Sequence, residues 1–270
     1  GASLYTTTDL ATIVEREEDF KPDRYIYVVD KRQAMHFEQV FRVAKKAGIV
    51  KPETQMVFLG FGTMNGKDGK PFKTREGGVM RLEKLIADID EEMYRKIVEN
   101  RSVKDKDAKD TAKIVGLSAI KYGDLSNQAT KDYVFDIDRF TSFEGNTGPH
   151  IQYMIVRIKS ILEKYKELRG ADAKVVPIRP AESETEKALQ MALCRFGEVT
   201  ESAFYETAPH KLCQYMAAVA DAFNAFYLEN KILSEEDAAK QAAFISLITL
   251  TKRVLDTCMD LLGMASTEHM

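Results

Sequence analysis

The sequence KDYVFDIDRFTSFEGNTGPHIQY, residues 131–153, marks the change between two kinds of structure and so decides the fold class. It places acidic, aromatic, glycine and proline residues together where a long helical region begins. After it, hydrophobic residues recur almost entirely at helical spacing, whereas two strand-like runs and a polar loop precede it. The pattern predicts an α/β layer followed by an all-α module, with this segment as the joint.

The α/β layer is predicted from a strand, a helix and a second strand that follow one another closely. Residues 25–30 (YIYVVD) and 55–62 (QMVFLGFG) have the composition of buried parallel strands, and 33–47 has helical periodicity. In such a unit, ligands bind at the carboxyl ends of the strands. We therefore expect functional residues near 30–33 and 60–64.

Further helices are predicted on both sides of the joint. A short helix over 8–17 would have Thr8 or Asp9 near its N-cap, where a side-chain oxygen accepts a free backbone N–H. The remaining periodic segments predict helices over 82–100, 106–125, 148–169, 183–196, 209–229 and 235–262, the last four packed as a bundle. Residues 170–183 form the clearest long connection in this region.

Composition limits the class of protein. The longest apolar run, 242–250, is far shorter than the roughly 20 residues that span a membrane, and the first residues lack the pattern of a secretory signal. Cys194, Cys213 and Cys258 are far apart and have neither disulfide-framework nor zinc-site spacing. The sequence therefore predicts a cytoplasmic protein with buried free thiols, no membrane partner and no metal site.

Net charge bears on nucleic-acid binding. A charge of −3 and a pI near 5.9 argue against a protein that coats DNA nonspecifically. A local basic face is nevertheless predicted on the helix 148–169, where Arg157 and Lys164 share one face and Lys159 and Lys166 a neighbouring one. The alternative is an ordinary solvated helix surface.

The loop NGKDGKPFKTREGG, residues 65–78, is too polar and glycine-rich for the interior of a helix or strand. Its candidate functional residues are Lys73, Thr74, Arg75, Gly77 and Gly78. Cations on a mobile glycine-rich loop can offset the charge that develops on a departing pyrophosphate. The alternative is a basic surface hairpin.

The wider segment DGKPFKTREGGVMRL, 68–82, resembles the second active-site signature of class I aminoacyl-tRNA synthetases, in the form found in arginyl-tRNA synthetases. Four more blocks resemble that family in the same order: GASLYTTTDLATI, KRQAMHFEQVF, IKYGDLSNQATKDYVFDIDRFTSFEGNTGPHIQY and LLGMASTEHM. Together they extend over essentially the whole chain, and ordered blocks are far more specific than a single motif.

The resemblance implies a fold and an activity. Residues 1–147 would be the C-terminal half of a Rossmann-like parallel-sheet catalytic domain, with the KTREGG loop and a helical region that contacts the tRNA stem. Residues 148–270 would be an α-helical-bundle anticodon-binding domain. The implied enzyme is an arginine-tRNA ligase that joins L-arginine to tRNA(Arg) with ATP as a substrate. Mg²⁺ is a candidate cofactor that would bind together with the ATP.

The first class I signature, of the His-x-Gly-His type, is absent, because the histidines are His36, His150, His210 and His269 and none has that spacing. We therefore expect the N-terminal part of the enzyme to be missing from this chain. The chain by itself should not catalyse arginine-dependent pyrophosphate exchange.

In the family, residues that match Tyr5, Asp9 and Gln33 line the arginine pocket. Asp9 would face the guanidinium, whose planar fork suits a bidentate carboxylate contact. Without the resemblance, Asp9 is equally well a helix cap, Tyr5 a core residue and Gln33 a surface residue.

The resemblance implies ATP contacts at the second strand and the loop. The backbone around Gly60, Gly62 and Met64 matches the place where adenine is held, and small residues let the backbone approach a base. Lys73, Thr74 and Arg75 would act in catalysis, with Gly77 and Gly78 completing the mobile ATP loop.

The resemblance also implies tRNA contacts. Tyr153, Tyr227 and Met270 match positions near the anticodon, and Arg157 lies on the basic face beside Tyr153. An aromatic ring beside a cation can stack on an unpaired base, worth ~1–3 kcal/mol. Taken singly, the two tyrosines and the methionine would more often be core residues.

Two functional classes follow. In the first, the chain belongs to an active synthetase. In the second, it is a stand-alone, catalytically inactive tRNA-binding or regulatory relative. The retained Tyr5, Asp9 and Gln33 favour descent from an active enzyme, and the missing histidine signature favours inactivity of this polypeptide alone.

Overall fold

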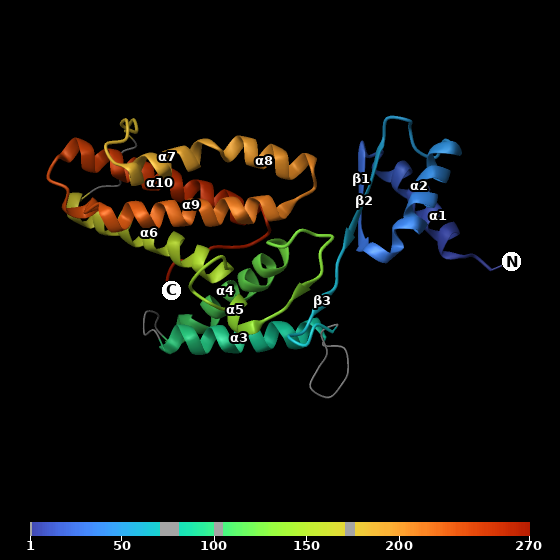
Figure 1. Cartoon of the computed structure of the whole chain (residues 1–270), viewed down its shortest axis with the longest axis horizontal. Coiled ribbons are helices and arrows are strands. Elements are labelled where there is room, and N and C mark those ends of the chain that lie inside the picture. Colours follow the sequence, from blue (N-terminus) through green and yellow to red (C-terminus); the bar gives the residue numbers. More distant parts are fainter. Residues whose placement is uncertain (1, 71–80, 100–104, 171–175) are drawn as a thin grey trace. The chain divides into compact units, whose positions relative to one another are not determined.

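The computed structural model describes residues 2–70, 81–99, 105–170 and 176–270 (Figure 1). They form two compact units: the first contains residues up to 70 together with 129–134, and the second contains the other described residues. The division falls inside the quoted segment, between Val134 and Phe135. The described residues between 81 and 128 thus lie in the same compact unit as the helical bundle.

The first unit contains the predicted strand–helix–strand unit. Its elements are α1 (Tyr5–Asp19), β1 (Arg24–Asp30), η1 (Lys31–Gln33), α2 (Ala34–Lys46) and β2 (Gln55–Phe61). The strands pair in parallel, with Arg24 opposite Gln55 and Asp30 opposite Phe61. Both strands therefore end at the same edge, as predicted.

The two faces of this small sheet differ. On one face, Tyr25 is buried with Ile13 of α1 and with Val40 and Ala44 of α2. On the other, Ile26 is 45% and Val28 59% exposed. Parallel strands are usually covered on both faces, so the second face is an unusually apolar surface.

A second pair of strands lies at the carboxyl edge of the first unit. β3 (Met64–Asn65) pairs in parallel with β4 (Tyr133–Val134). Each strand has two residues, too few to show a period in the sequence, and their partners are far apart along the chain. Sequence periodicity therefore could not predict this pair.

The predicted N-cap of the first helix is wrong. The helix begins at Tyr5, and its N-cap, Leu4, makes no side-chain capping hydrogen bond. Thr8 Oγ1 donates instead to the Tyr5 carbonyl oxygen, and the Asp9 carboxylate contacts His36 of α2. The side chains of Thr8 and Asp9 therefore make other contacts, about one turn inside the helix.

The second unit begins with α3 (Leu82–Glu99), α4 (Asp105–Leu125) and the short α5 (Ile137–Phe140). The first two match the predicted helices. Leu85, Ile89, Met93 and Ile97 form the buried stripe of α3. A Cβ on Gly123 of α4 would lie 2.2 Å from Cε2 of Phe140, so the glycine lets α5 pack closely.

The remaining helices form the predicted bundle (Figure 1): α6 (Gly148–Arg169), α7 (Glu184–Cys194), α8 (Phe196–Tyr205), α9 (Pro209–Glu229) and α10 (Ala238–Leu261). A short turn, η2 (Ile232–Ser234), precedes α10. The sequence analysis missed α8, in which only Ala203 is buried and which follows α7 directly. Phe196, Val199 and Ala203 recur along α8 at helical spacing, so the signal was present but covers only ten residues.

The start of α6 is held by polar contacts. Thr147 caps the helix by accepting the His150 N–H, and its hydroxyl donates to the Ser142 carbonyl oxygen. The hydroxyl of the buried Tyr122 lies within hydrogen-bond distance of both Asn146 Oδ1 and the Cys213 carbonyl oxygen. The joint is therefore fastened to both α4 and α9.

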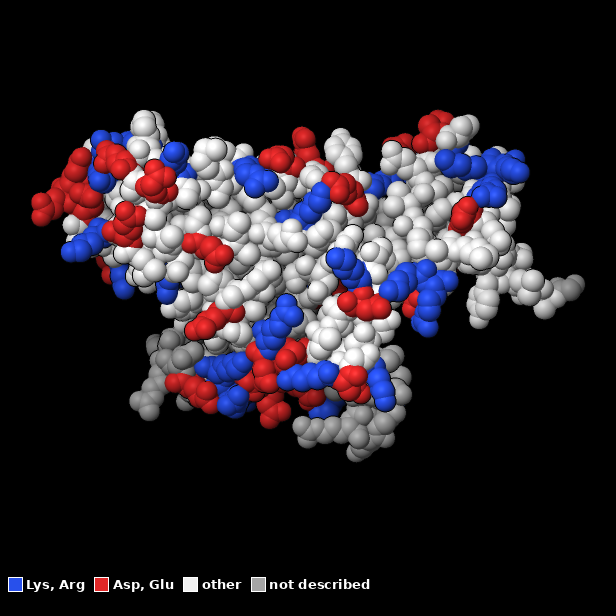
Figure 2. All heavy atoms as spheres, viewed as in Figure 1, with Lys and Arg blue, Asp and Glu red and all other residues white. Residues whose placement is uncertain are grey.

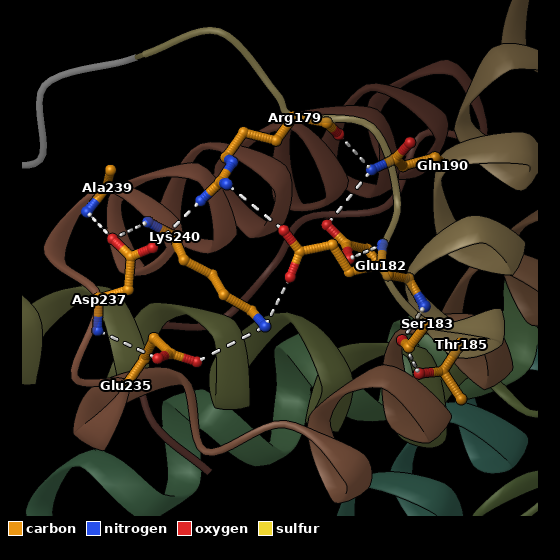
Figure 3. A network of polar contacts seen from close by, with 10 residues as sticks. Arg179, Glu182, Ser183, Thr185, Gln190, Glu235, Asp237, Ala239 and Lys240 are labelled. Atoms are coloured by element: carbon orange, nitrogen blue, oxygen red, sulfur yellow. Dashed lines mark hydrogen bonds and ion pairs between the residues drawn. The ribbon is translucent and has the colours of Figure 1, made fainter.

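The connection that precedes α7 is fastened to the start of α10 (Figure 3). Glu182 accepts from Lys240 Nζ at 2.9 Å, and Arg179 lies 3.4 Å from both Glu182 and Asp237. Asp237 also caps α10 by accepting the backbone N–H groups of Ala239 and Lys240. These contacts order residues 176–183, the described part of the predicted connection.

The thiols differ in access. Cys213 and Cys258 are buried as predicted, and burial raises the pKa of each to about 12. The prediction is wrong for Cys194, which is exposed at the end of α7. Within the described ranges, the structure has no helix with the length and apolar character needed to cross a lipid bilayer.

Asp90 on α3 should destabilise the second unit at neutral pH. Its Oδ1 is buried without a hydrogen-bond partner among the described residues, and burial raises its pKa. A raised folded-state pKa means that stability falls as pH rises from the unfolded to the folded value. We expect Asp90→Asn to stabilise the protein at pH 7, and less so at pH 4, in urea unfolding. The exposed Asp110→Asn is the control, and an equal gain at both pH values would contradict the expectation.

Candidate functional site

An open groove of about 660 Å³ lies between α6, α9 and η2. Its lining includes Tyr153, Arg157, Tyr227 and Met270, which are the four residues predicted to contact tRNA. Tyr153 and Tyr227 are 38% and 36% exposed, so neither is a core residue. The bundle therefore brings together side chains that the sequence could relate only through resemblance.

Arg157 is the centre of this group. Its Cζ lies 4.6 Å from the ring centroid of Tyr153 and 5.0 Å from that of Tyr227, both within cation–π range. Its Nη2 donates to Tyr153 Oη at 2.9 Å, and its Nη1 donates to Asn224 Oδ1 at 2.8 Å. The predicted helical spacing of Tyr153 and Arg157 gives the first contact, and α9 supplies the others.

The groove is cationic although the chain carries a net charge of −3. Arg157, Lys164 and Lys231 line it, and no acidic side chain is among its described lining residues. Elsewhere the surface is mixed: along α3, Figure 2 shows both signs together, and pairs such as Lys84–Asp88 and Arg95–Glu92 neutralise one another. The groove is thus a local concentration of positive charge suited to phosphate groups.

The C-terminal segment is fixed against α6 by Gln152, which is fully buried. Its amide nitrogen donates to Ser118 Oγ at 2.9 Å and to the Ala265 carbonyl oxygen at 2.6 Å, and its Oε1 accepts the Thr267 N–H at 3.2 Å. These bonds determine the path of the residues that lead to Met270 at the edge of the groove.

Lys159 adds a second attachment about two turns further along α6. Its ammonium donates to the Thr267 carbonyl oxygen at 2.9 Å and to Glu268 Oε1 at 2.6 Å. Hydrogen bonding to Lys159 lowers the pKa of Glu268. Met270 lies where this groove meets a second one of about 600 Å³, lined in part by Lys159 and Lys166.

The predicted arginine-binding residues lie in the first unit. Asp9 Oδ2 is 2.6 Å from His36 Nε2, so the carboxylate sits beside the first turn of α2, directly after Gln33. Tyr5 is one helical turn before Asp9 and is 86% exposed, which excludes a core role. His36 is a neighbour of the predicted pocket that the sequence analysis missed. Its position three residues after Gln33, about one helical turn, was the available signal.

The glycines predicted near adenine make room for the chain itself. A Cβ on Gly60 would lie 2.8 Å from Lys31 Cα, and one on Gly62 would lie 2.3 Å from the Lys131 carbonyl oxygen. Asp132 accepts from Lys31 Nζ and from the Thr63 N–H, each at 2.7 Å. The carboxyl edge of β1 and β2 is therefore closed by residues 129–132, and Met64 lies just beyond it in β3.

The loop residues Lys73, Thr74, Arg75, Gly77 and Gly78 lie outside the described residues. Within the described part of the chain, no group of three or more His, Cys, Asp or Glu side chains could hold a metal ion.

Comparison with known families gives this arrangement a context. The model of the catalytic domain of class I (R) tRNA synthetases matches residues 1–137, half of the chain. The chain belongs to the arginyl-tRNA synthetase family. The model of the DALR anticodon-binding domain matches residues 151–270, which contain the whole groove. The predicted fold class, part of a class I catalytic domain followed by a helical anticodon-binding domain, is confirmed.

Relatives within this family are similar over the whole chain. Identity is 57% to an arginine–tRNA ligase of Agathobacter rectalis and 54% to one of Alkaliphilus oremlandii. The chain spans 46% of the length of each relative and is similar to the C-terminal half of arginyl-tRNA synthetases. The family assignment does not favour the alternative of a stand-alone regulatory relative.

Solved structures agree. The arginyl-tRNA synthetase of Plasmodium falciparum superposes with a TM-score of 0.81 at 26% identity over 99% of this chain and 45% of its own. That of Thermus thermophilus shares the fold, with a TM-score of 0.84 at 23% identity over 100% of this chain and 50% of its own.

The sequence thus predicted two groups of residues, those of the groove and those near Asp9, and the structure adds neighbours to each. His36 is the neighbour in the second group. Beside the groove the added neighbours are Lys231, which lies in the connection after α9, and Asn224, one helical turn before Leu228 on α9. Neither has a distinctive sequence signal, because a lone polar residue near a helix end is common.

Proposed function

We propose that this chain is the anticodon-binding part, and one half of the catalytic domain, of an arginine-tRNA ligase. The observation that supports this best is the meeting of Tyr153, Arg157, Tyr227 and Met270 in one cationic groove. Such a groove suits an unpaired stretch of tRNA, because exposed rings stack on bases while cations pair with phosphates. The proposed partner is tRNA(Arg), as membership of the arginyl-tRNA synthetase family implies.

Tyr227→Ala tests the groove. We expect binding to tRNA(Arg) to weaken about 5- to 150-fold, which corresponds to the ~1–3 kcal/mol of one base stacked on an aromatic ring. Binding to a fully paired RNA duplex should change little. Tyr227→Phe keeps the ring and should bind as the original chain does. Fluorescence anisotropy with labelled RNA measures each affinity.

The matched control is Tyr205→Ala, because Tyr205 is an exposed tyrosine at the end of α8, away from the groove. Equal losses on tRNA and duplex, or an equal loss in the control, would count against base stacking in the groove.

For the catalytic part, the proposed reaction has two steps. The arginine carboxylate attacks the α-phosphate of ATP, which releases pyrophosphate and forms arginyl-adenylate. A terminal ribose hydroxyl of tRNA(Arg) then attacks the arginyl carbonyl carbon, and AMP leaves with the proton passed to solvent. Catalysis of this kind rests on positioning and charge stabilisation. Asp9 would bind the guanidinium, with Tyr5 and Gln33 completing that side of the pocket.

The ATP site of the proposal contains Gly60, Gly62 and Met64. The loop residues Lys73, Thr74, Arg75, Gly77 and Gly78 would lie over the phosphates. Mg²⁺ fits as an ion that enters with ATP, because phosphate oxygens and water supply most of its ligands. The free thiols suit a reducing compartment, and we propose the cytoplasm.

The rest of the enzyme is the further proposed partner. The apolar sheet face of Ile26 and Val28 is uncovered, and the relatives are about twice as long as this chain. We infer that the N-terminal part of the catalytic domain packs on this face and supplies the missing histidine signature. Without it the arginine and ATP pocket has one wall only.

Val28→Asp tests this interface. The chain alone should show no arginine-dependent pyrophosphate exchange, and adding the N-terminal half of the Agathobacter rectalis relative should restore it. Val28→Asp should abolish the restored exchange yet leave tRNA binding intact, because a charge on the sheet face cannot be buried unpaired. Val43→Asp, at an exposed position of α2, is the matched control. Exchange by the unmixed chain would contradict the prediction.

A further inference from the structure

The space beside the two tyrosine rings of the groove is occupied by a side chain of the protein itself. The guanidinium of Arg157 lies over both Tyr153 and Tyr227. A guanidinium plane and a nucleobase use the same aromatic face for stacking. A base that stacks on either ring from the groove side therefore competes with Arg157 for that position.

The partners that hold Arg157 are all uncharged. They are the Asn224 amide oxygen, the Tyr153 hydroxyl and the two rings, and no carboxylate pairs with Arg157 among the described residues. Hydrogen bonds from a guanidinium to a phosphate are charge-assisted and stronger than those to neutral oxygens. A nucleotide therefore offers Arg157 a better partner than the ones it would leave.

The groove also leaves room for such a movement. Its volume of about 660 Å³ opens beside Ser160 and Lys164, which follow Arg157 along α6. Lys164 and Lys231 already make that part of the lining cationic, so a phosphate would be attracted there. A long arginine side chain can reach a phosphate while its own backbone stays in the helix.

We propose that Arg157 is a displaceable plug. It holds the stacking position in the free protein, an unpaired base replaces it on the rings, and its guanidinium then pairs with a phosphate of the same RNA. This inference rests on the proposed tRNA-binding function of the groove and adds to it a closed state and an open state. It also predicts that duplex RNA, which offers phosphates but no free base, leaves the plug in place.

The plug model and a simple contact surface predict opposite changes in RNA affinity when a group that holds Arg157 is removed. Tyr153→Phe removes the hydroxyl that accepts from Arg157 but keeps the ring. Asn224→Ala removes the other acceptor. If these groups only hold the plug, losing either makes displacement easier, and the affinity for an unpaired base rises. If they contact RNA directly, their loss weakens binding.

The experiment uses the 270-residue chain and the anticodon stem-loop of tRNA(Arg), with versions that carry a single abasic loop nucleotide. For Tyr153→Phe and Asn224→Ala, we expect the ratio of intact to abasic affinity to rise about three- to tenfold, the effect of one hydrogen bond. Urea unfolding confirms that each variant is folded. A fall in this ratio in the isosteric Tyr153→Phe variant would overturn the plug.

The Arg157 side chain gives an independent readout. In the free protein its Nε–H and Cδ nuclear magnetic resonance signals should be shifted upfield by the two rings. The intact stem-loop should move them downfield, and a paired duplex should not. If the intact stem-loop binds and the upfield shift of the Arg157 signals is retained, the plug proposal is contradicted but the tRNA-binding proposal is not. If the original chain binds no stem-loop, both proposals are contradicted.

Discussion

Gln152→Met is expected to lower the free energy of unfolding by about 2–4 kcal/mol, because it strips hydrogen-bond partners from buried groups. The fully buried amide contacts Ser118, the Ala265 carbonyl oxygen and the Thr267 N–H. Methionine fills nearly the same volume and offers no comparable donor or acceptor. The buried Thr267 N–H would then have lost its partner, and the Ala265 carbonyl oxygen its contact with the amide. Urea unfolding followed by circular dichroism measures the loss.

The same substitution should weaken tRNA binding, because Gln152 fixes the segment that carries Met270. Lys159 would still tether that segment through contacts at Thr267 and Glu268, but the bonds of Gln152 to residues 265 and 267 would be gone. Gln190→Met on α7 is the control: Gln190 donates to the Arg179 carbonyl oxygen and does not line the groove. Both variants are compared at a temperature where they are folded. If tRNA affinity falls no further for Gln152→Met than for this control, then Met270 does not contribute to tRNA binding.

Gly62→Ala should destabilise the first unit by about 2–4 kcal/mol, at or above the usual cost of overpacking. The added Cβ would lie 2.3 Å from the carbonyl oxygen of Lys131 and 2.7 Å from the Asp132 nitrogen. Both atoms belong to the backbone, so no side-chain rotation relieves the clash. The ion pair between Lys31 and Asp132 should be lost along with the β3–β4 pairing.

A matched control separates the clash from the general effect of replacing glycine. Gly69 has a φ of +72°, and no other atom lies within 4 Å of the place that a Cβ would take, so Gly69→Ala should cost only about 1 kcal/mol of backbone strain. Amide resonances of residues 24–61 report the unfolding of this unit. Equal stability of the two variants would mean that residues 129–132 can move away at little cost.

Strong periodicity made most of the fold predictable. The long helix α6 begins and ends where the sequence indicates, because Thr147 caps it and Gly170 follows with a φ of +68°. The two-residue strands carry no such signal, and that of α8 is short and weakly buried. Their conformations depend on partners that are distant in sequence or on weak burial, so local reasoning could not reach them.

The candidate sites were predictable only in part. Helical spacing places Tyr153 and Arg157 on one face, but Tyr227 and Met270 join them only through the packing of α9 and the path fixed by Gln152. At Gly62, the missing side chain could equally serve a base or the protein backbone. The sequence indicates that some group lies very close to this glycine, but it does not indicate which group that is.

The difference in access among the three thiols gives the chain a ready chemical handle. At neutral pH, Cys213 and Cys258 stay protonated and shielded, while Cys194 on α7 meets solvent away from the groove. A maleimide dye should therefore attach at a single site without any mutation. The sequence thus already contains one accessible cysteine at which a fluorescent label can report on the bundle and its ligand.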